Sequence, residues 1–218
     1  GLSGAAGDGS FPAFKVFLAA GSDAHGDLNY EATMDAVDFL SKPSRGLTGY
    51  AEDNAFGKLT TLAHCPRGMG RRGENVLAAL RHGKTVMSNG PLLIAGFDLN
   101  SNGSLDDAPD VVIGGETVSK LNQLAPLQLQ WASSNEFGPF VSIRLIIGTA
   151  AGESNPEDVP IPPAMNIASP GLIALDLRAR LEKLSGPGVY LRLEARTRNG
   201  GGEEFRCYTN PVWIRISE

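Results

Sequence analysis

The sequence is poor in the side chains from which disulfide frameworks and metal clusters are built. Its 218 residues include only two cysteines, Cys65 and Cys207, and three histidines. A disulfide scaffold and a cysteine-rich zinc site are therefore both excluded within this chain. A metal centre that uses several histidines cannot be assembled from this chain alone.

An excess of basic charge and long apolar runs are lacking too. The 19 Lys and Arg residues are outnumbered by 24 Asp and Glu residues, which gives a net charge of −5. This balance provides no field that would attract nucleic acid or an anionic membrane surface, so neither is an expected partner. The longest apolar stretches, such as Phe17–Ala20 and Pro91–Phe97, are far too short to span a bilayer. The compartment, cytoplasmic or exported, stays open.

Glycine and proline are abundant, with 27 and 14 residues. Together they exceed the roughly 12% of average usage, which favours turns and β structure over a helix bundle. Beyond residue 91 apolar and polar residues alternate in about seven segments bounded by turn residues. These segments are Leu92–Phe97, Val111–Val118, Leu127–Trp131, Val141–Leu145, Ile173–Arg178, Val189–Arg196 and Val212–Ile216. They predict an antiparallel, immunoglobulin-like β-sandwich over residues 91–218.

The first 90 residues have a different pattern. The apolar run Phe14–Ala20 breaks at once into polar residues, which predicts a buried strand of the parallel type that opens onto a site. Tyr30–Leu40 and Glu74–His82 have apolar residues at helical spacing, and residues 43–72 read as a long loop. The fold class is therefore α+β, with an α/β segment that ends near Gly90.

The sequence Gly21-Ser22-Asp23-Ala24-His25 follows directly on the first predicted strand. Residues two apart at an extended strand end point the same way, so Asp23 and His25 can approach one metal ion together. A carboxylate oxygen and an imidazole nitrogen suit Zn²⁺, Mn²⁺ or Fe²⁺. The alternative is an ordinary turn, in which Asp23 caps a helix and His25 faces solvent.

Three stretches of the chain resemble one family in the expected order. Phe17–His25 looks like the last metal-binding motif of the PHP (polymerase and histidinol phosphatase) superfamily of metallohydrolases. Val76–Pro91, which ends in Ser-Asn-Gly-Pro, resembles the helix and strand that follow this motif in the CehA/McbA-like branch. Tyr208–Ile214 resembles the closing Thr-Asn-Pro strand of that branch.

The resemblance implies a distorted barrel of alternating strands and helices that holds divalent Zn, Mn or Fe. Such metals activate water against a small-molecule ester or phosphoester substrate. Only Asp23 and His25 carry over as ligands, because the opening His-x-His motif of the family and its middle Glu and His ligands are absent from this sequence. We therefore expect residues 1–90 to be the C-terminal remnant of a PHP-type domain whose N-terminal barrel half lies upstream. Residues 91–218 would be its accessory domain, and the chain alone would be inactive.

The stretch that begins at Asp98 resembles the start of a calcium-binding loop, with Gly103 at the sharp turn. The expected ligands are the side chains of Asp98, Asn100, Asn102 and Asp106 and the carbonyl of Ser104. Pro109 stands where such loops have a bidentate Glu, although Asp107 or Asp110 would be an alternative anchor. The competing interpretation is an Asn-Gly hairpin turn.

Two further candidates come from the loop predicted at 43–72. Arg67, Arg71 and Arg72 precede the helix at Glu74, so they are candidates to bind an anion, against the simpler interpretation of a basic loop. His64 is a candidate third metal ligand, against that of a solvated loop histidine. The alternative function for the whole chain is a non-catalytic β-sandwich binding module, stabilised by calcium and facing a carbohydrate.

Overall fold

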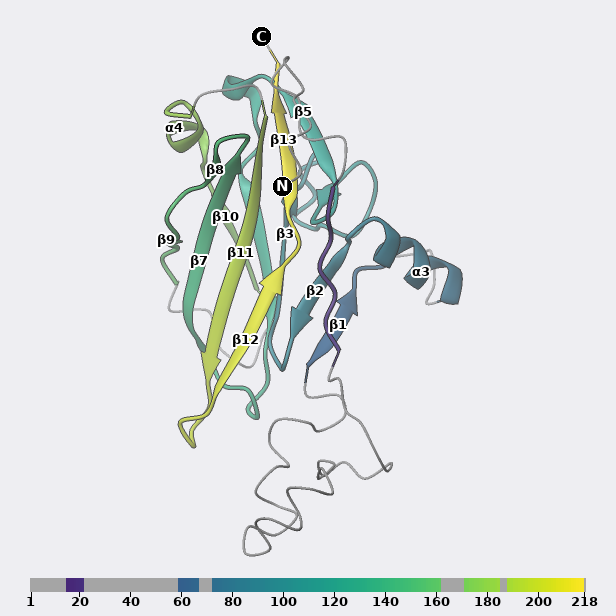
Figure 1. Ribbon diagram of the computed structural model, residues 1–218, viewed down its shortest axis with the longest axis vertical. Coiled ribbons are helices and arrows are strands. Elements are labelled where there is room, and N and C mark those ends of the chain that lie inside the picture. Colours follow the sequence, from purple (N-terminus) through teal and green to yellow (C-terminus); the bar gives the residue numbers. More distant parts are fainter. Residues whose placement is uncertain (1–14, 22–58, 67–71, 162–170, 185–187, 218) are drawn as a thin grey trace, which may run out of the picture.

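The computed structural model describes residues 15–21, 59–66, 72–161, 171–184 and 188–217, and two β-sheets account for most of them (Figure 1). The larger sheet has nine strands. Six of them follow the order β1-β2-β12-β11-β13-β5, and β7, with which β8 and β9 pair, also pairs with β11. Their bounds are β1 Thr60–Ala63, β2 Thr85–Ser88, β5 Glu116–Ser119, β7 Phe140–Thr149, β8 Gly152–Glu153, β9 Glu157–Asp158, β11 Gly188–Arg198, β12 Glu204–Thr209 and β13 Val212–Ile216. All pairs are antiparallel except β13 with β5, which is parallel.

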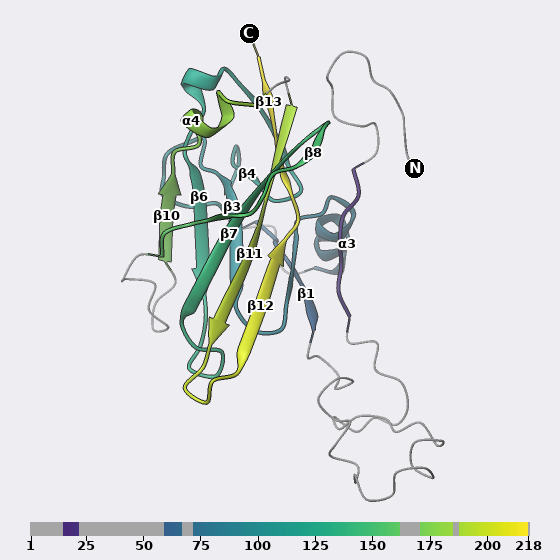
Figure 2. The ribbon, with the colours of Figure 1, turned by 60° about the vertical axis from the view of Figure 1, so that its left-hand side comes forward.

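The smaller sheet lies against one face of the larger one (Figure 2). Its four strands are antiparallel in the order β10-β6-β3-β4. Their bounds are β3 Leu92–Phe97, β4 Val111–Val112, β6 Leu127–Ala132 and β10 Gly171–Leu175. The helical elements are short: α3 Gly73–Arg81, η3 Leu121–Gln123 and α4 Arg178–Leu181.

One hydrophobic core fills the space between the two sheets. In β6 and β11 buried residues alternate with partly exposed ones, as period-two patterning requires when one face of a strand is covered. Both sheets contribute fully buried side chains, among them Phe97, Leu129, Leu145, Leu191 and Leu193. Each such side chain contributes about 1.5–3 kcal/mol when removed from water. The prediction of antiparallel sheets packed as a β-sandwich is confirmed.

β12 and β13 run one after the other along the same edge of β11. β12 pairs with Glu194–Arg198 and β13 with Gly188–Leu191, so the two form one long strand with a break at Asn210-Pro211. On the outer side of the break, β12 pairs with β2 and β13 pairs with β5. Residues on both sides of Gly90 therefore share one sheet.

The prediction of a buried strand at Phe14–Ala20 is wrong for its described part. Residues 15–21 are extended but belong to no strand, and most of them are exposed. Val16 is 69% exposed and Leu18 is 54% exposed. The high hydrophobicity of this run predicted that it would be buried. In the structure the surrounding described residues cover only part of Phe17 and Ala20 and leave the rest of the segment exposed.

Other boundaries differ from the sequence-based prediction for local reasons. β1 lies inside the loop predicted at residues 43–72. The prediction missed it because a four-residue strand has too few positions to show an alternation of apolar and polar residues. The predicted strand Val111–Val118 is broken at Gly114, whose φ of +79° lets the chain cross from one sheet to the other. The strand predicted to reach Arg178 ends earlier, because the Asp176 carboxylate accepts the Arg178 backbone N–H at 3.0 Å.

Helix α3 agrees with the prediction for residues 74–82. Gly83 follows it with a φ of +65°, the left-handed conformation that commonly ends a helix. Within the described residues, no helix has the length and apolar character needed to cross a membrane. The helix predicted at Tyr30–Leu40 lies outside the described residues.

Candidate functional site

The predicted metal ligands Asp23 and His25 lie outside the described residues, but the segment that leads to them does not. This segment, Lys15–Gly21, crosses the larger sheet beside β1, β2 and β13 (Figures 1 and 2). Since Gly21 is only two residues before Asp23, the contacts of the segment fix where the chain enters the predicted motif.

Asn210, at the break between β12 and β13, holds the segment at Leu18. The buried Asn210 side chain accepts the Leu18 N–H at 2.8 Å and donates to the Leu18 carbonyl oxygen at 2.9 Å. Its Nδ2 also lies 2.6 Å from the hydroxyl of Thr85, the first residue of β2. A buried amide with all of these partners forms an oriented anchor, because each group left unpaired would cost about 1–3 kcal/mol.

Thr61, on β1, anchors the segment a second time. Its hydroxyl donates to the Ala20 carbonyl oxygen at 2.8 Å and accepts the Ala20 N–H at 2.7 Å. The other end of the segment is fixed by Lys15, which pairs with Glu116 at 2.8 Å and lies 4.5 Å from the centre of the Trp213 ring. Phe17 meets the same ring edge-on, with the two ring centres 5.7 Å apart.

The Ser-Asn-Gly-Pro sequence begins at the last residue of β2 and is hydrogen-bonded to β12. The Ser88 hydroxyl donates to the Pro91 carbonyl oxygen and accepts the Gly90 N–H. The Asn89 side chain accepts the Arg206 N–H at 2.5 Å, and the Asn89 N–H donates to the Arg206 carbonyl oxygen at 3.2 Å. The described parts of the stretches Phe17–His25, Val76–Pro91 and Tyr208–Ile214 therefore meet in space, although they are far apart in the sequence.

The predicted calcium loop is satisfied internally through Asp98. This carboxylate, only 6% exposed, accepts the backbone N–H groups of Asn102 and Gly103 at 3.2 and 2.8 Å and the Gln128 amide at 3.0 Å. Burial opposes ionisation of Asp98, but the hydrogen bonds from Gly103, Gln128 and Asn102 outweigh it and lower its pKa. Asp98 thus organises the turn as a carboxylate.

The remaining predicted calcium ligands bond to one another or to the backbone. The side-chain oxygens of Asn100 and Asn102 accept backbone N–H groups two residues on, at 3.0 and 2.8 Å, and both side-chain amides donate to Asp107. Ser104 donates its hydroxyl to Asp106. Burial and the neighbouring Asp107 raise the pKa of Asp110. In the part of the chain that the structure describes, no group of three His, Cys, Asp or Glu side chains is placed to hold a metal.

Calcium binding by this loop stays a prediction, and calorimetry tests it. We expect saturable Ca²⁺ binding with a Kd of about 10⁻⁴–10⁻³ M, the range of weak structural sites. Asp98→Asn should abolish it, since the variant loses the charge at the first ligand position. The control is Asp176→Asn, because Asp176 also accepts a backbone N–H in a turn but lies outside the loop. Absence of binding heat at millimolar Ca²⁺ would contradict the prediction.

Of the three predicted anion-binding arginines only Arg72 is described, and it is the exposed residue that precedes α3. Its guanidinium lies 3.9 Å from the Glu74 carboxylate. Arg67 and Arg71 lie outside the described residues.

His64 and the two cysteines lie among the described residues, where none of them belongs to a group of three potential metal ligands. Burial, and then the charge of Lys84, lower the pKa of His64, so its imidazole is neutral at pH 7. Its buried Nδ1 has no hydrogen-bond partner among the described residues. Cys65 and Cys207 are both free, and burial raises the pKa of Cys207 to about 12, which makes that thiol unreactive.

Sequence reasoning missed the anchors Asn210, Thr61 and Thr85. A signal for Asn210 was available, because asparagine followed by proline is disfavoured inside a strand and so points to a special role. Thr61 and Thr85 gave none, since threonine is common in strands.

No protein-family model, curated protein or solved structure matches this chain.

Proposed function

We propose that this chain is the C-terminal part of a metal-dependent hydrolase of the PHP type, and that its β-sandwich positions the segment carrying Asp23 and His25. The observation that supports this most is the anchor at Asn210. One buried side chain joins Leu18, which precedes the predicted metal motif, to Thr85 on β2. The sandwich thus holds, on its outer surface, the extended segment that leads to the predicted metal ligands.

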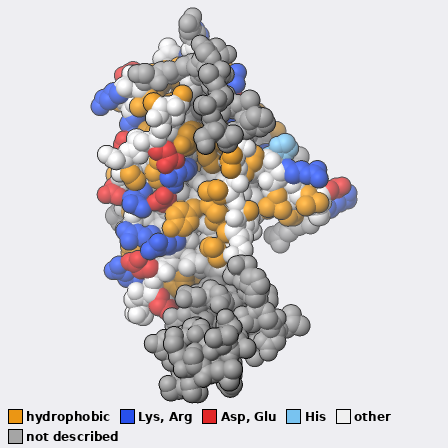
Figure 3. Space-filling view, in the orientation of Figure 1, with side chains coloured by type: hydrophobic (Ala, Val, Ile, Leu, Met, Phe, Trp, Pro, Cys, Tyr) orange, Lys and Arg blue, Asp and Glu red, His pale blue; other side chains and the backbone are white. Residues whose placement is uncertain are grey.

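A second observation is the apolar surface around α3. This helix projects from the body of the molecule, and only Ala79 of its nine residues is buried (Figure 1). Leu77 and Leu80 are exposed, as are Leu62 of β1 and Leu18 of the anchored segment. Apolar side chains extend from the middle of the sheet to α3 (Figure 3). Such a surface is expected where a barrel continues beyond these residues.

The donor set of the motif suits a shared metal centre. One carboxylate and one imidazole fit Zn²⁺, Mn²⁺ or Fe²⁺, but a catalytic site normally takes at least three protein ligands. Asp23 and His25 would therefore supply part of the centre, and the rest would come from other residues of the enzyme. Divalent metals of this kind supply an activated water that attacks an ester or phosphoester. The anchors at residues 18 and 20 would fix the entry of the two ligands into that centre.

The proposal is tested on the protein encoded by the whole reading frame. We expect a His-x-His motif upstream of residue 1, bound divalent metal, and turnover of a generic phosphodiester such as bis-(4-nitrophenyl) phosphate. Asp23→Asn and His25→Ala should each lower both metal content and turnover by more than the 10–100-fold that loss of an outer-shell partner costs. Asp27→Asn is the matched control, because it removes a nearby carboxylate outside the motif.

The 218-residue chain tested alone should show no turnover, because two ligands cannot hold a catalytic metal tightly. A whole protein without bound metal and without turnover would contradict the proposal. So would full activity in the Asp23→Asn and His25→Ala variants.

A second candidate, a non-catalytic β-sandwich binding module, is favoured by one observation. The outer face of the larger sheet carries a hollow lined by arginine side chains. This hollow is independent of Asp23 and His25.

A further inference from the structure

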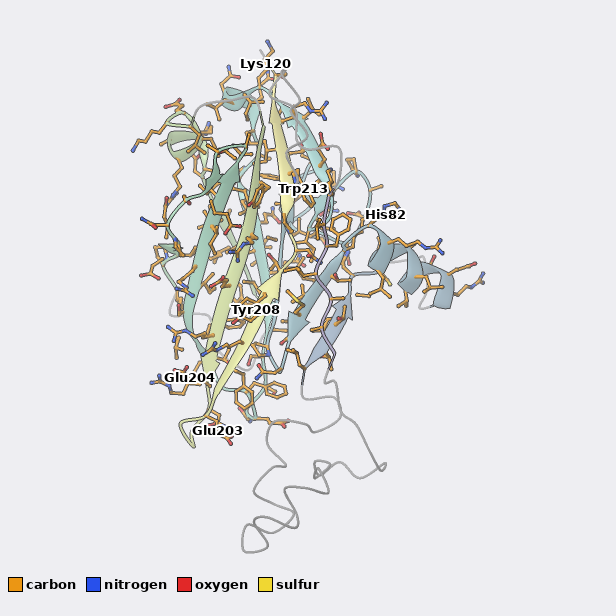
Figure 4. All side chains as sticks on the ribbon, in the orientation of Figure 1. His82, Lys120, Glu203, Glu204, Tyr208 and Trp213 are labelled. Carbon is orange, nitrogen blue, oxygen red and sulfur yellow. The ribbon has the colours of Figure 1, made fainter. Side chains whose placement is uncertain are left out.

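The outer face of the larger sheet, turned away from the core, is strongly charged over β7, β11 and β12. Basic and acidic side chains gather there (Figure 3). Two cross-strand rows follow from the register. Ser142, Arg196 and Arg206 form one row, and Arg144, Glu194 and Tyr208 form the next. Figure 4 labels Tyr208 and Glu204, which lie on β12.

Arg196 and Arg206 are directly opposite each other in the register of β11 and β12. Like charges at such positions destabilise a sheet, so an unrelieved pair is unexpected. The only carboxylate that pairs with Arg196 among the described residues is Glu204, at 3.7 Å, which is too long for a hydrogen bond. Glu204 also binds Arg198 more closely. Arg206 forms no ion pair with any residue that the structure describes. It is hydrogen-bonded to Tyr208, and the more distant carboxylates of Glu204 and Glu194 attract it more weakly.

A hollow of about 150 Å³ lies over these two rows. It is lined by Ser142, Arg144, Glu194, Arg196, Arg206 and Tyr208. The one carboxylate among them is already neutralised, because Glu194 binds Arg144 at 2.6 Å and Arg192 at 2.8 Å through its two oxygens. Three guanidinium groups from three strands line the hollow against one carboxylate, and Arg144 is the one that this carboxylate already binds. The lining therefore carries a surplus of positive charge at Arg196 and Arg206, in a chain whose net charge is −5.

We propose that this hollow binds a tetrahedral oxyanion, a phosphate or sulfate group. Guanidinium groups form short, charge-assisted hydrogen bonds with such oxygens, and a tetrahedral anion has enough acceptors for donors that arrive from three directions. The hydroxyls of Ser142 and Tyr208 add further donors on the same lining. The volume is ample, since one water needs only about 10–15 Å³ of comparable space. A bound anion would also relieve the repulsion between Arg196 and Arg206.

A second hollow of about 410 Å³ adjoins the first and shares Ser142 and Arg196 with it. Its lining includes the apolar residues Val141 and Ile161 together with Asp158, whereas Ile143 and Val159 beneath it are almost wholly buried. The organic part of a phosphate or sulfate ester would fit there, next to its anionic group. Binding measurements can therefore distinguish a free phosphate or sulfate ion from the anionic group of an ester.

Titration of the purified chain with inorganic phosphate at low salt, followed by calorimetry, tests the site. We expect saturable binding with a Kd of about 1 mM. Arg206→Gln and Arg196→Gln should each weaken it about tenfold or more, the value of one charge-assisted hydrogen bond. The matched control is Arg178→Gln, which removes the same charge from an exposed arginine paired with Asp176 outside the hollow. Circular dichroism of each variant checks that the fold is retained.

Phenyl phosphate in place of inorganic phosphate separates the two sources of the anion. Tighter binding of phenyl phosphate supports an ester whose organic part occupies the second hollow, and equal binding supports free phosphate. Lack of saturation, or an equal loss of affinity in Arg178→Gln, overturns the proposal. None of these outcomes depends on Asp23, His25 or hydrolysis, so the site and the proposed enzyme fail separately.

Discussion

Gly114→Ala is expected to lower the free energy of unfolding by about 3–4 kcal/mol. A Cβ at this position would lie 2.1 Å from the His82 carbonyl oxygen and 2.5 Å from the Gly83 carbonyl carbon, both of them backbone atoms. His82 follows α3 at its junction with the sandwich (Figure 4). Overpacking costs about 1–3 kcal/mol, and the left-handed conformation at φ +79° adds about 1–2 kcal/mol for a residue with a side chain.

The measurement is urea denaturation followed by tryptophan fluorescence. Gly202→Ala is the matched control, because Gly202 has a similar φ of +88° but nothing within 4 Å of the added Cβ. This control isolates the conformational cost, about 1–2 kcal/mol. Equal losses in the two variants would show that the close approach of Gly114 to the end of α3 is absent in solution.

Asn210→Ala is expected to lower the free energy of unfolding by about 2–3 kcal/mol. The change removes the side-chain hydrogen bonds to Leu18 and Thr85 and leaves a buried threonine hydroxyl short of a partner. Unsatisfied buried groups cost about 1–3 kcal/mol each, and water can reach the half-exposed Leu18 to offset part of the loss. Hydrogen exchange gives a local readout, because the Leu18 amide should lose most of its protection.

Asn122→Ala serves as the control for this variant, since Asn122 is exposed on η3. A substitution there should change stability by less than about 0.5 kcal/mol. An Asn210→Ala variant with unchanged protection at Leu18 would contradict the anchor and would remove the main support for the proposed hydrolase.

The sandwich was predictable because its strands follow a simple rule. Leu127–Trp131 and Val189–Arg196 alternate cleanly, as strands must when one face lies on a core. The short strand β1 and the switch of sheets at Gly114 were not predictable in this way, because they depend on pairing partners distant in the sequence. The apolar run before Gly21 misled for a related reason. Hydrophobicity alone does not say whether other residues cover a segment.

The candidate sites also differ in whether they depend on local sequence or on the pairing of distant strands. The Asp23-x-His25 motif and the loop at Asp98 are local patterns, so the sequence suffices to propose them. The hollow at Arg196 and Arg206 arises only when the register of β11 and β12 places two arginines side by side. Alternating arginines on a strand read as an ordinary solvated face, and nothing in the sequence specifies the register that brings them together.

The anchor at Asn210 also has a consequence for the order of folding. It joins residues 192 positions apart, and closing so long a loop is entropically unfavourable until the sandwich has formed. The β11–β12 hairpin pairs residues close in sequence and presents Asn210 early. We therefore expect the segment that leads to Asp23 to dock last, onto a preformed surface. In that sequence of events the sandwich acts as an assembly template for the predicted metal centre.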